Sequence, residues 1–301
     1  MTQHQLLDLG RVVAAHGRHV MVEKPDGERV LCHPRGKKSD IVVGDLVRWQ
    51  PTGDAGVIER IESRSNLLFR QDEWRTKSFA ANLDQILIMV AAEPVFSESQ
   101  LTRALIAAKA AGIAALIGFN KTDLPTATAA RQRLAPYVGM GATVIELALK
   151  TQPEASRATL WHHLGGRVTL VLGPSGMGKS TLINLLVPEA AAVVGEISQA
   201  LNTGRHTTTS STWYWLDAQR KAALIDSPGF QEFGLRQIGP EQLAQLMPDY
   251  AAALGQCKFH NCSHRHEPGC GVRAAIERGD ITPSRQRIYE SLFDELSTKR
   301  W

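Results

Sequence analysis

The chain has 301 residues, 43% of them hydrophobic, with a formal net charge of +4 and a pI near 8.9. This length predicts two or three domains, and no apolar stretch approaches the length of a membrane span. The polar N-terminus is not a signal peptide, so we expect a cytoplasmic protein without membrane association. The mildly basic balance is compatible with a nucleic-acid partner but is not diagnostic of one.

Residues 1–65 are predicted to form a small β-barrel. About five strands in this stretch, separated by turns rich in Gly, Pro and Asp, indicate an OB-fold, and an SH3-like barrel fits the same pattern. Basic residues are interspersed, as in OB-folds that bind RNA, and the alternative is a passive solvated face. The expected strands are Leu6–Ala15, His19–Glu23, Arg29–His33, Leu46–Gln50 and Val57–Ile61.

Residues 66–234 are predicted to form an α/β domain. After a polar connector at residues 64–82, short buried-type strands alternate with amphipathic helices, which is typical of a parallel sheet. The expected strands cover residues 84–91, 113–119, 143–147, 168–172 and 222–225, and the expected helices cover residues 99–111, 126–137, 153–164 and 181–187.

A complete phosphate-loop motif, G-x-x-x-x-G-K-[ST], follows the strand at 168–172 and precedes a helix, which is the context that this motif requires. The glycines permit a backbone whose N–H groups point at a polyphosphate. Lys179 would reach the β- and γ-phosphates, and the Ser180 hydroxyl would ligate Mg²⁺. The motif alone does not separate ATP from GTP. Its residues are Gly173, Pro174, Ser175, Gly176, Met177, Gly178, Lys179 and Ser180, followed by Thr181.

A second motif, N-K-x-D, ends the strand at 113–119 and consists of Asn120, Lys121, Thr122 and Asp123. Open α/β sheets bind ligands at this end of their strands. The Asp123 carboxylate can accept hydrogen bonds from the N1–H and 2-amino groups of guanine, a donor pair that adenine lacks. Together with the phosphate loop, this motif predicts a guanine-nucleotide site.

The remaining nucleotide motifs lie further along the chain. Asp226-Ser227-Pro228-Gly229 is a D-x-x-G sequence at a strand end, in which Asp226 would hold Mg²⁺ through water and the Gly229 N–H would meet the γ-phosphate. Upstream, one of Thr207–Thr209 is expected to ligate Mg²⁺, with Thr208 as the first choice.

Phe230 follows the D-x-x-G motif, where many GTPases carry a glutamine that orients the attacking water. Phenylalanine cannot do this, so we expect slow intrinsic hydrolysis and a water-positioning group from elsewhere. His206 is the nearest candidate in sequence, and the alternative is a solvent-exposed loop histidine. His206 and Lys179 are therefore the expected catalytic residues.

The order of these motifs is itself informative. In ordinary GTPases the N-K-x-D motif lies C-terminal to the phosphate loop, whereas here Asn120–Asp123 precedes Gly173. This reversal indicates a circularly permuted GTPase domain.

Residues 235–301 are predicted to form a helical zinc-binding domain, with helices at 240–247, 272–278 and 284–296. The sequence between the first two holds three cysteines and several histidines, which indicates one structural Cys₃His zinc site rather than a disulfide, because three thiols would leave one unpaired. His260 and His266 compete for the fourth position. The expected ligands are Cys257, Cys262, His264 and Cys270.

These elements together resemble the small ribosomal subunit biogenesis GTPases, the ribosome small subunit-dependent GTPase A family of bacteria. The resemblance covers nearly the whole chain and includes the motif order, Gly204-Arg205-His206-Thr207-Thr208-Thr209, and C-x4-C-x-H-x5-C. It implies an OB domain, a circularly permuted GTPase domain and a C-terminal zinc domain. It also implies a factor in late 30S maturation that binds the small subunit and its rRNA, with GTP hydrolysis stimulated by the subunit, and a catalytic role for His206.

One stretch departs from the family pattern. The base-contacting loop usually reads close to Ser-Ala-Lys, and here it reads Ala148-Leu149-Lys150. Because that loop contacts the base partly through its backbone, nucleotide binding is expected to survive. Two other functions remain open at this point: an RNA-binding module with a vestigial nucleotide site, and a phosphate-loop ATPase or kinase. Nothing in the sequence requires more than a monomer.

Overall fold

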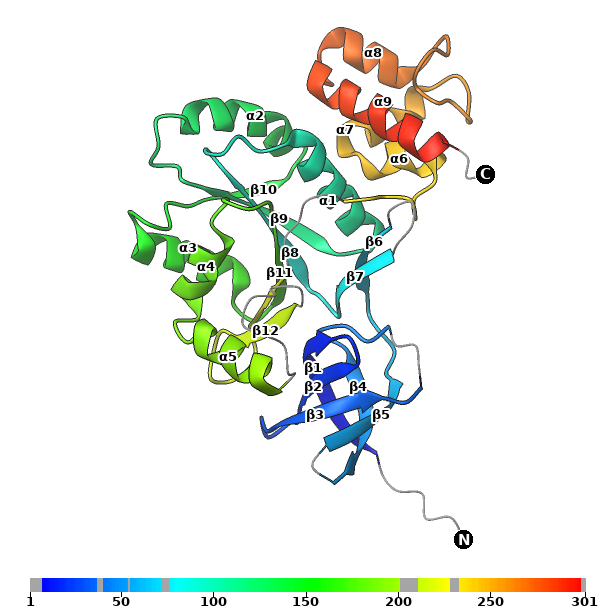
Figure 1. Cartoon of the computed structure of the whole chain (residues 1–301). Helices are drawn as coiled ribbons and strands as arrows, with labels where there is room; N and C mark the ends of the chain where they lie inside the picture. Colours follow the sequence, from blue (N-terminus) through cyan, green and yellow to red (C-terminus); the bar gives the residue numbers. More distant parts are fainter. Residues whose placement is uncertain are drawn as a thin grey trace.

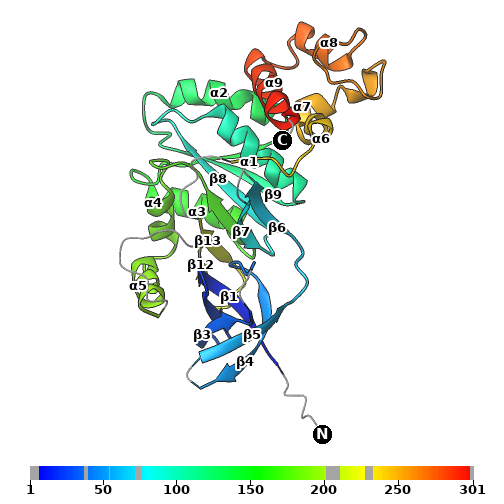
Figure 2. The same ribbon diagram turned by 45° about the vertical axis from the view of Figure 1, so that its right-hand side comes forward.

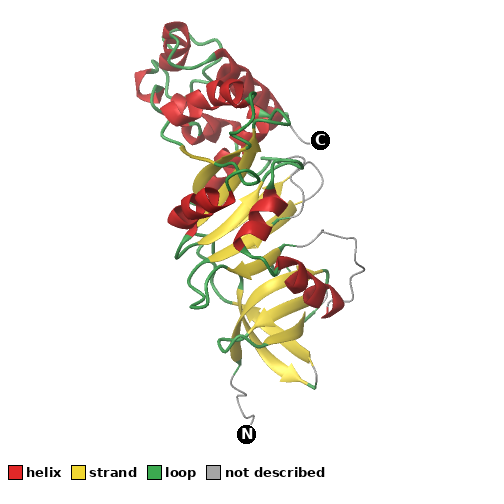
Figure 3. Ribbon diagram, turned by 90° about the vertical axis from the view of Figure 1, so that its left-hand side faces the viewer, coloured by secondary structure: helices red, strands yellow, loops and turns green. Residues whose placement is uncertain are grey.

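The computed structural model describes residues 7–36, 40–53, 55–71, 76–200, 211–227 and 233–298. Three parts follow one another along the chain: a β-barrel near the N-terminus, an α/β sheet with flanking helices, and a C-terminal group of helices (Figure 1). The barrel and the C-terminal helices lie at opposite ends of the molecule, with the α/β part between them (Figure 3). The predicted three-part fold class is confirmed.

The barrel has the strand order β1-β2-β3-β5-β4, and it closes through a pairing of β1 with β4. Strands β3 and β5 are parallel and the other neighbouring pairs are antiparallel, which is the OB-type arrangement. Val12, Cys32 and Trp49 lie in its separate hydrophobic core. The strands are β1 (Asp8–His16), β2 (His19–Glu23), β3 (Arg29–Pro34), β4 (Leu46–Thr52) and β5 (Ala55–Ile61).

The segment expected to be a polar connector instead contains an antiparallel hairpin, β6 (Leu67–Gln71) and β7 (Thr76–Ala81). Its charged residues obscured the strand pattern in the sequence, although Leu68 and Phe79 are buried. We call β6 and β7 together the connector hairpin. It touches the barrel through a bridge between Val43 and Ala80, and it touches the chain that leads to the C-terminal helices through a bridge between Gln71 and Leu235.

The α/β part has the strand order β10-β9-β8-β11-β13-β12. The neighbouring pairs are parallel except for β12 with β13. These two strands lie at the end of the sheet next to β1 of the barrel (Figure 2). The strands are β8 (Gln85–Ala91), β9 (Ala114–Asn120), β10 (Thr143–Glu146), β11 (Val168–Leu172), β12 (Thr212–Trp215) and β13 (Ala223–Asp226), and the helices are α1 (Glu98–Ala110), α2 (Ala127–Gly139), α3 (Pro153–Leu164), α4 (Lys179–Leu186) and α5 (Ala190–Ala200). The strand that precedes the phosphate loop, β11, therefore lies in the middle of the sheet.

The barrel continues this sheet, because β1 pairs with β12 at Ala14 and Thr212. Glu23 of the barrel reinforces the junction: its carboxylate is 5% exposed and accepts a 2.7 Å hydrogen bond from Trp215 Nε1. We did not predict β12 from the sequence, although its Trp-Tyr-Trp run is typical of a strand.

The C-terminal helices are α6 (Pro240–Leu246), α7 (Pro248–Ala251), α8 (Gly271–Arg278) and α9 (Pro283–Ser297), with a 3₁₀ turn at Leu254–Gln256. They pack on α1 of the α/β part. Arg285 on α9 is 2% exposed; it pairs with Asp249 and donates a 2.6 Å hydrogen bond to Thr102 Oγ1 on α1. Within the described chain, no helix is long and apolar enough to cross a membrane.

Candidate nucleotide-binding site and metal centre

The phosphate loop leads from β11 into α4, and its glycines have backbone angles that favour glycine. Gly173, Gly176 and Gly178 have φ values of 148°, 83° and 101°. A Cβ on Gly178 would lie 2.2 Å from Asn120 Nδ2, and one on Gly173 would lie 2.6 Å from the Met89 carbonyl oxygen. Glycine at these two positions thus permits both the turn and the close approach of Met89 in β8 and of Asn120 at the end of β9.

Lys179 begins α4, and its ammonium group folds back over the loop. Its Nζ donates hydrogen bonds of 2.6 Å to the Gly173 carbonyl and 2.9 Å to the Pro174 carbonyl. Burial lowers the pKa of Lys179, and the nearby Asp226 carboxylate acts in the opposite direction. Burial likewise raises the pKa of Asp226, at the end of β13, and Lys179 opposes that shift. The two charges therefore share one partly desolvated region beside the loop.

Asn120 ties the N-K-x-D motif to the phosphate loop. Its Nδ2 donates a 3.0 Å hydrogen bond to the Met177 carbonyl, and its Oδ1 accepts one of 3.3 Å from the Leu149 N–H. The side chain is only 4% exposed. One amide therefore holds three segments together: the end of β9, the phosphate loop and the loop after β10.

These segments line an open cavity of about 520 Å³, within the range expected for a small-molecule site. The cavity lies at the carboxyl ends of β9 and β11, where open parallel sheets bind ligands. Nine predicted residues line it: Asn120, Lys121, Asp123, Ser175, Gly176, Gly178, Lys179, Ser180 and Thr181.

Other predicted residues contribute to this region without lining the cavity. Thr122 turns toward the protein and bonds the Leu147 carbonyl through its Oγ1 at 3.0 Å. The Met177 side chain is buried at 2% exposure, while its carbonyl meets Asn120. Pro174, like Gly173, presents its carbonyl to Lys179. Thr208, Gly229 and His206 lie outside the described residues.

Sequence reasoning missed several residues of the site. Leu124 and Thr151 also line the cavity, next to Leu149 and Lys150 of the stretch that the sequence had pointed to as the base-contacting loop. Glu93, two residues after β8, accepts a hydrogen bond from Lys121 Nζ through its carbonyl and one of 2.9 Å from Thr126 through its carboxylate. Its place just beyond a strand's carboxyl end was the available signal.

A buried hydroxyl supports the loop at 148–150. Ser156 on α3 is 4% exposed, and its Oγ accepts a 3.2 Å hydrogen bond from the Ala148 N–H. The next N–H, that of Leu149, is the one that Asn120 accepts. Two successive backbone groups of the loop are thus fixed by side chains from different elements.

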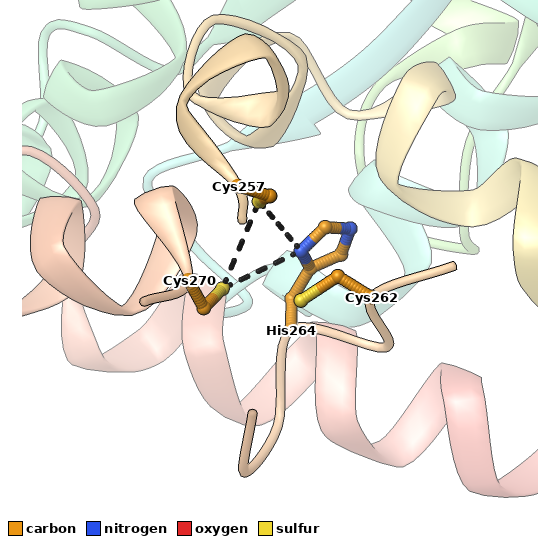
Figure 4. A group of neighbouring side chains, drawn as sticks. All are labelled: Cys257, Cys262, His264 and Cys270. Atoms are coloured by element: carbon orange, nitrogen blue, oxygen red, sulfur yellow. Dashed lines mark hydrogen bonds between the residues drawn. The ribbon is translucent and has the colours of Figure 1, made fainter. Parts of the chain in front are cut away.

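The second site is a Cys₃His cluster in the C-terminal helices, formed by Cys257, Cys262, His264 and Cys270 (Figure 4). The four ligand atoms lie within 4.8 Å of one another. Cys257 Sγ lies 3.9 Å from Cys270 Sγ and 3.5 Å from His264 Nδ1. Tetrahedral zinc with bonds of about 2.3 Å to sulfur places two sulfurs about 3.8 Å apart, so the donor set fits zinc.

The same geometry bears on the alternatives that the sequence left open. All four cysteines are free, and 3.9 Å is far too long for a disulfide bond. His260 and His266 are exposed and do not belong to the cluster. His264 has a positive φ of 62°, which turns its ring toward the cysteines.

Glu267 holds the loop that carries this histidine. Its carboxylate accepts a 2.7 Å hydrogen bond from the Ser263 N–H and bonds of 3.1 Å from the Arg265 and His266 N–H groups. The Tyr289 hydroxyl on α9 donates a 3.0 Å bond to the Ser263 carbonyl. The cluster is therefore supported from α9 as well as from within its own loop.

Comparison with known proteins places these features in a family. The family model described as RsgA GTPase matches residues 61–236. The chain is 59% identical to a small ribosomal subunit biogenesis GTPase RsgA of Variovorax paradoxus, over 100% of this chain and 96% of that protein. It is 52% identical to the protein of the same name from Paraburkholderia phymatum, over 96% of this chain and 92% of that protein.

Solved structures agree with this comparison. YjeQ from Thermotoga maritima superposes with a TM-score of 0.74 at 31% identity, over 98% of this chain and 100% of that one. YloQ, described as a circularly permuted GTPase, superposes with a TM-score of 0.71 at 26% identity, over 100% of this chain and 99% of that one. The reversed motif order and the central position of β11 therefore reflect circular permutation.

Proposed function

The chain belongs to the RsgA GTPase family, and from this premise we propose that its GTP hydrolysis serves late maturation of the 30S ribosomal subunit. The names of its relatives, small ribosomal subunit biogenesis GTPases, support the role in subunit biogenesis. The observation that carries the proposal is the Asn120 side chain, which joins the guanine-reading motif to the phosphate loop on one cavity. A chance N-K-x-D sequence beside an ATP site would have no reason to make that contact.

The base end of the nucleotide would lie against the N-K-x-D segment and the loop at 148–150. The Asp123 carboxylate would accept hydrogen bonds from the guanine N1–H and 2-amino groups. Adenine lacks this pair of donors, so the carboxylate would distinguish guanine from adenine. Lys121 and Lys150 flank the same cavity. This end of the site provides the selectivity for GTP and GDP over adenine nucleotides.

The phosphate end would lie against the loop from Gly173 to Ser180. When nucleotide binds, the Lys179 ammonium group would leave the Gly173 and Pro174 carbonyls and bind the β- and γ-phosphates. Its hydrogen bonds to phosphate would be stronger because both partners are charged. Ser180 and Thr208 would ligate Mg²⁺, and Asp226 would hold it through water; bound Mg²⁺ neutralises phosphate charge. The partly buried position of the Asp226 carboxylate beside Lys179 fits this role.

Intrinsic hydrolysis is expected to be slow, because Phe230 cannot orient a water molecule. His206 would take this task when the small subunit binds. We further propose that the subunit stimulates hydrolysis and that the barrel contacts its rRNA; the basic residues of the barrel, including Arg18 and Arg48, support such a contact. The protein would act as a monomer in the cytoplasm.

The Cys₃His cluster would hold one structural zinc ion through Cys257, Cys262, His264 and Cys270. A site with four protein ligands has no open position for substrate. Zinc would fix the loop between the 3₁₀ turn and α8, in addition to the contact that Tyr289 of α9 makes with Ser263. The proposed domain bounds are 1–65 for the barrel, 66–234 for the GTPase domain and 235–301 for the zinc domain.

The decisive experiment measures GTP hydrolysis by the purified protein with and without small ribosomal subunits. Strong stimulation by small subunits, and none by large subunits, is expected. Equal and slow rates in both would contradict the proposed activator. In parallel, GDP should displace a fluorescent guanine nucleotide and ADP should not; displacement by ADP would contradict guanine selectivity.

A further inference from the structure

We call residues 201–210 and 228–232 the first and second switch segments. They contain the proposed nucleotide-site residues Thr208 and Gly229, and each is followed by a residue that the structure describes. Ser211 follows the first segment and Phe233 follows the second. Both contact one residue of the connector hairpin, Phe79. Ser211 Oγ donates a 3.2 Å hydrogen bond to the Phe79 carbonyl, and the Phe79 and Phe233 rings stack with centroids 5.5 Å apart and planes 10° apart.

Phe79 itself is firmly held. It is 4% exposed and lies on β7, whose next residue, Ala80, pairs with both Leu68 of β6 and Val43 of the barrel. The following Ala81 N–H donates a 3.0 Å bond to the Val43 carbonyl. Phe79 is therefore a fixed point between the barrel and the α/β part, and its carbonyl and ring offer two independent contacts.

Contacts other than the ring stack also hold Phe233 in place. Its ring is 1% exposed, and its carbonyl accepts a 3.2 Å hydrogen bond from Arg103 Nη1 on α1. The next residue, Gly234, accepts a hydrogen bond of 3.2 Å from the Gln71 N–H of β6. The connector hairpin thus binds the chain after the second segment through both of its strands.

We propose that Phe79 is a positioning residue for GTP hydrolysis, which holds Ser211 and Phe233, the residues that follow the two switch segments, in one relative arrangement. This inference rests on the proposed function. The ring fixes Phe233 and the carbonyl fixes Ser211, so loss of the ring releases Phe233 from its place relative to Ser211. The described lining of the nucleotide cavity comes from other elements, so binding of GDP does not depend on Phe79.

The test compares Phe79→Leu with Phe69→Leu in the full-length protein. Phe69 is a partly buried residue of β6 in the same hairpin, next to α1 and α6, so the two variants remove the same ring from neighbouring strands. We expect Phe79→Leu to lower kcat for GTP hydrolysis about tenfold or more, because small displacements of reacting groups are costly. Its Kd for fluorescent GDP should stay within about twofold, as should both constants in Phe69→Leu.

A double-mutant cycle tests the contact itself. Phe233→Leu should lower kcat as much as Phe79→Leu, and the double variant should lose little more than either single variant. Ser211→Ala should also lower kcat, by a smaller factor, and it removes only a hydroxyl outside the hairpin core, so it remains informative if the ring variants fail to fold.

Three results would overturn the role of Phe79: wild-type kcat in Phe79→Leu and in Ser211→Ala, an equal loss of kcat in Phe69→Leu, or a loss of GDP affinity that matches the loss of kcat. Wild-type protein in the same assays separates the two proposals. A wild type that does not hydrolyse GTP overturns the proposed function and this inference with it. An active wild type matched by Phe79→Leu and Ser211→Ala overturns this inference alone.

Discussion

Asn120 and Met177 are 57 residues apart in sequence, and the Asn120 side chain donates a 3.0 Å hydrogen bond to the Met177 carbonyl. This contact brings a motif at the end of β9 against the phosphate loop after β11. In the sheet β8 separates these two strands, so the amide reaches across a strand end. The permuted chain therefore rebuilds one nucleotide site from two segments in reversed order.

Asn120→Ala should weaken GDP binding by about tenfold to a hundredfold, because two buried hydrogen bonds of about 1 to 1.5 kcal/mol each are lost. Titration with a fluorescent GDP analogue measures the effect. Asn184→Ala, the same substitution on the exposed side of α4, is the matched control and should bind as the wild type does. Equal Kd values for the two variants would contradict the bridging role.

Ser156→Ala should weaken GDP binding several-fold, since the Ala148 N–H loses its buried acceptor at a cost of about 1 kcal/mol or more. The effect should be larger for guanine than for phosphate recognition, so competition by GDP should weaken more than competition by pyrophosphate. Thr159→Ala removes a hydroxyl from the exposed side of the same helix and should change neither. A Ser156→Ala variant with wild-type affinity would show that the loop holds its shape without the hydroxyl.

Arg285→Ala should destabilise the C-terminal helices strongly, by about 3 to 5 kcal/mol, because the Asp249 side chain, which is 7% exposed, would lose its charged partner. Urea unfolding followed by tyrosine fluorescence, or limited proteolysis, reports the change. Arg287 lies on the exposed face of the same helix, so Arg287→Ala should unfold at the same urea concentration as the wild type. If the two variants unfold at the same urea concentration, the buried ion pair contributes little to the stability of the interface with α1.

Chelation should remove one zinc ion per chain and expose the loop at 257–270 to proteolysis. His260→Ala and His266→Ala should retain zinc, whereas His264→Ala should not. Metal analysis of the four proteins decides this prediction. Zinc retained by His264→Ala and lost from either control would assign the fourth ligand elsewhere.

Zinc binding should weaken as the pH falls. Burial raises the pKa of Cys262 to about 12 in the metal-free chain, so its thiol must release a proton to ligate. Burial lowers the pKa of His264, which keeps its ring neutral and able to ligate at neutral pH. Protons therefore compete mainly at the thiols, and lower pH favours the metal-free form. Zinc release, followed with a chromogenic chelator from pH 8 to pH 5, tests this prediction. An affinity for zinc that stays constant over this range would contradict it.

The amino-acid sequence by itself determined the elements with strong local signals. The phosphate loop needs glycine at fixed positions for its backbone angles, and the N-K-x-D and D-x-x-G motifs follow buried strands that the residue pattern reveals. The order of Asn120 and Gly173 already indicated circular permutation. The spacing of Cys257, Cys262 and Cys270 likewise indicated a metal cluster, because thiolates are zinc ligands and cysteine is recognisable in the sequence.

Only the tertiary structure decided what depends on contacts between distant segments. It brought His264, and neither His260 nor His266, together with the three cysteines; ligand atoms must converge in space, and sequence spacing permits all three histidines. It revealed the connector hairpin, whose strands are stabilised by the barrel and the segment after Phe233 rather than by their own alternation. The contacts of Ser156 with Ala148 and of Phe79 with Phe233 have the same origin. A hydrogen bond or a ring stack between residues far apart in the chain leaves no local pattern, since its partners are chosen by the fold.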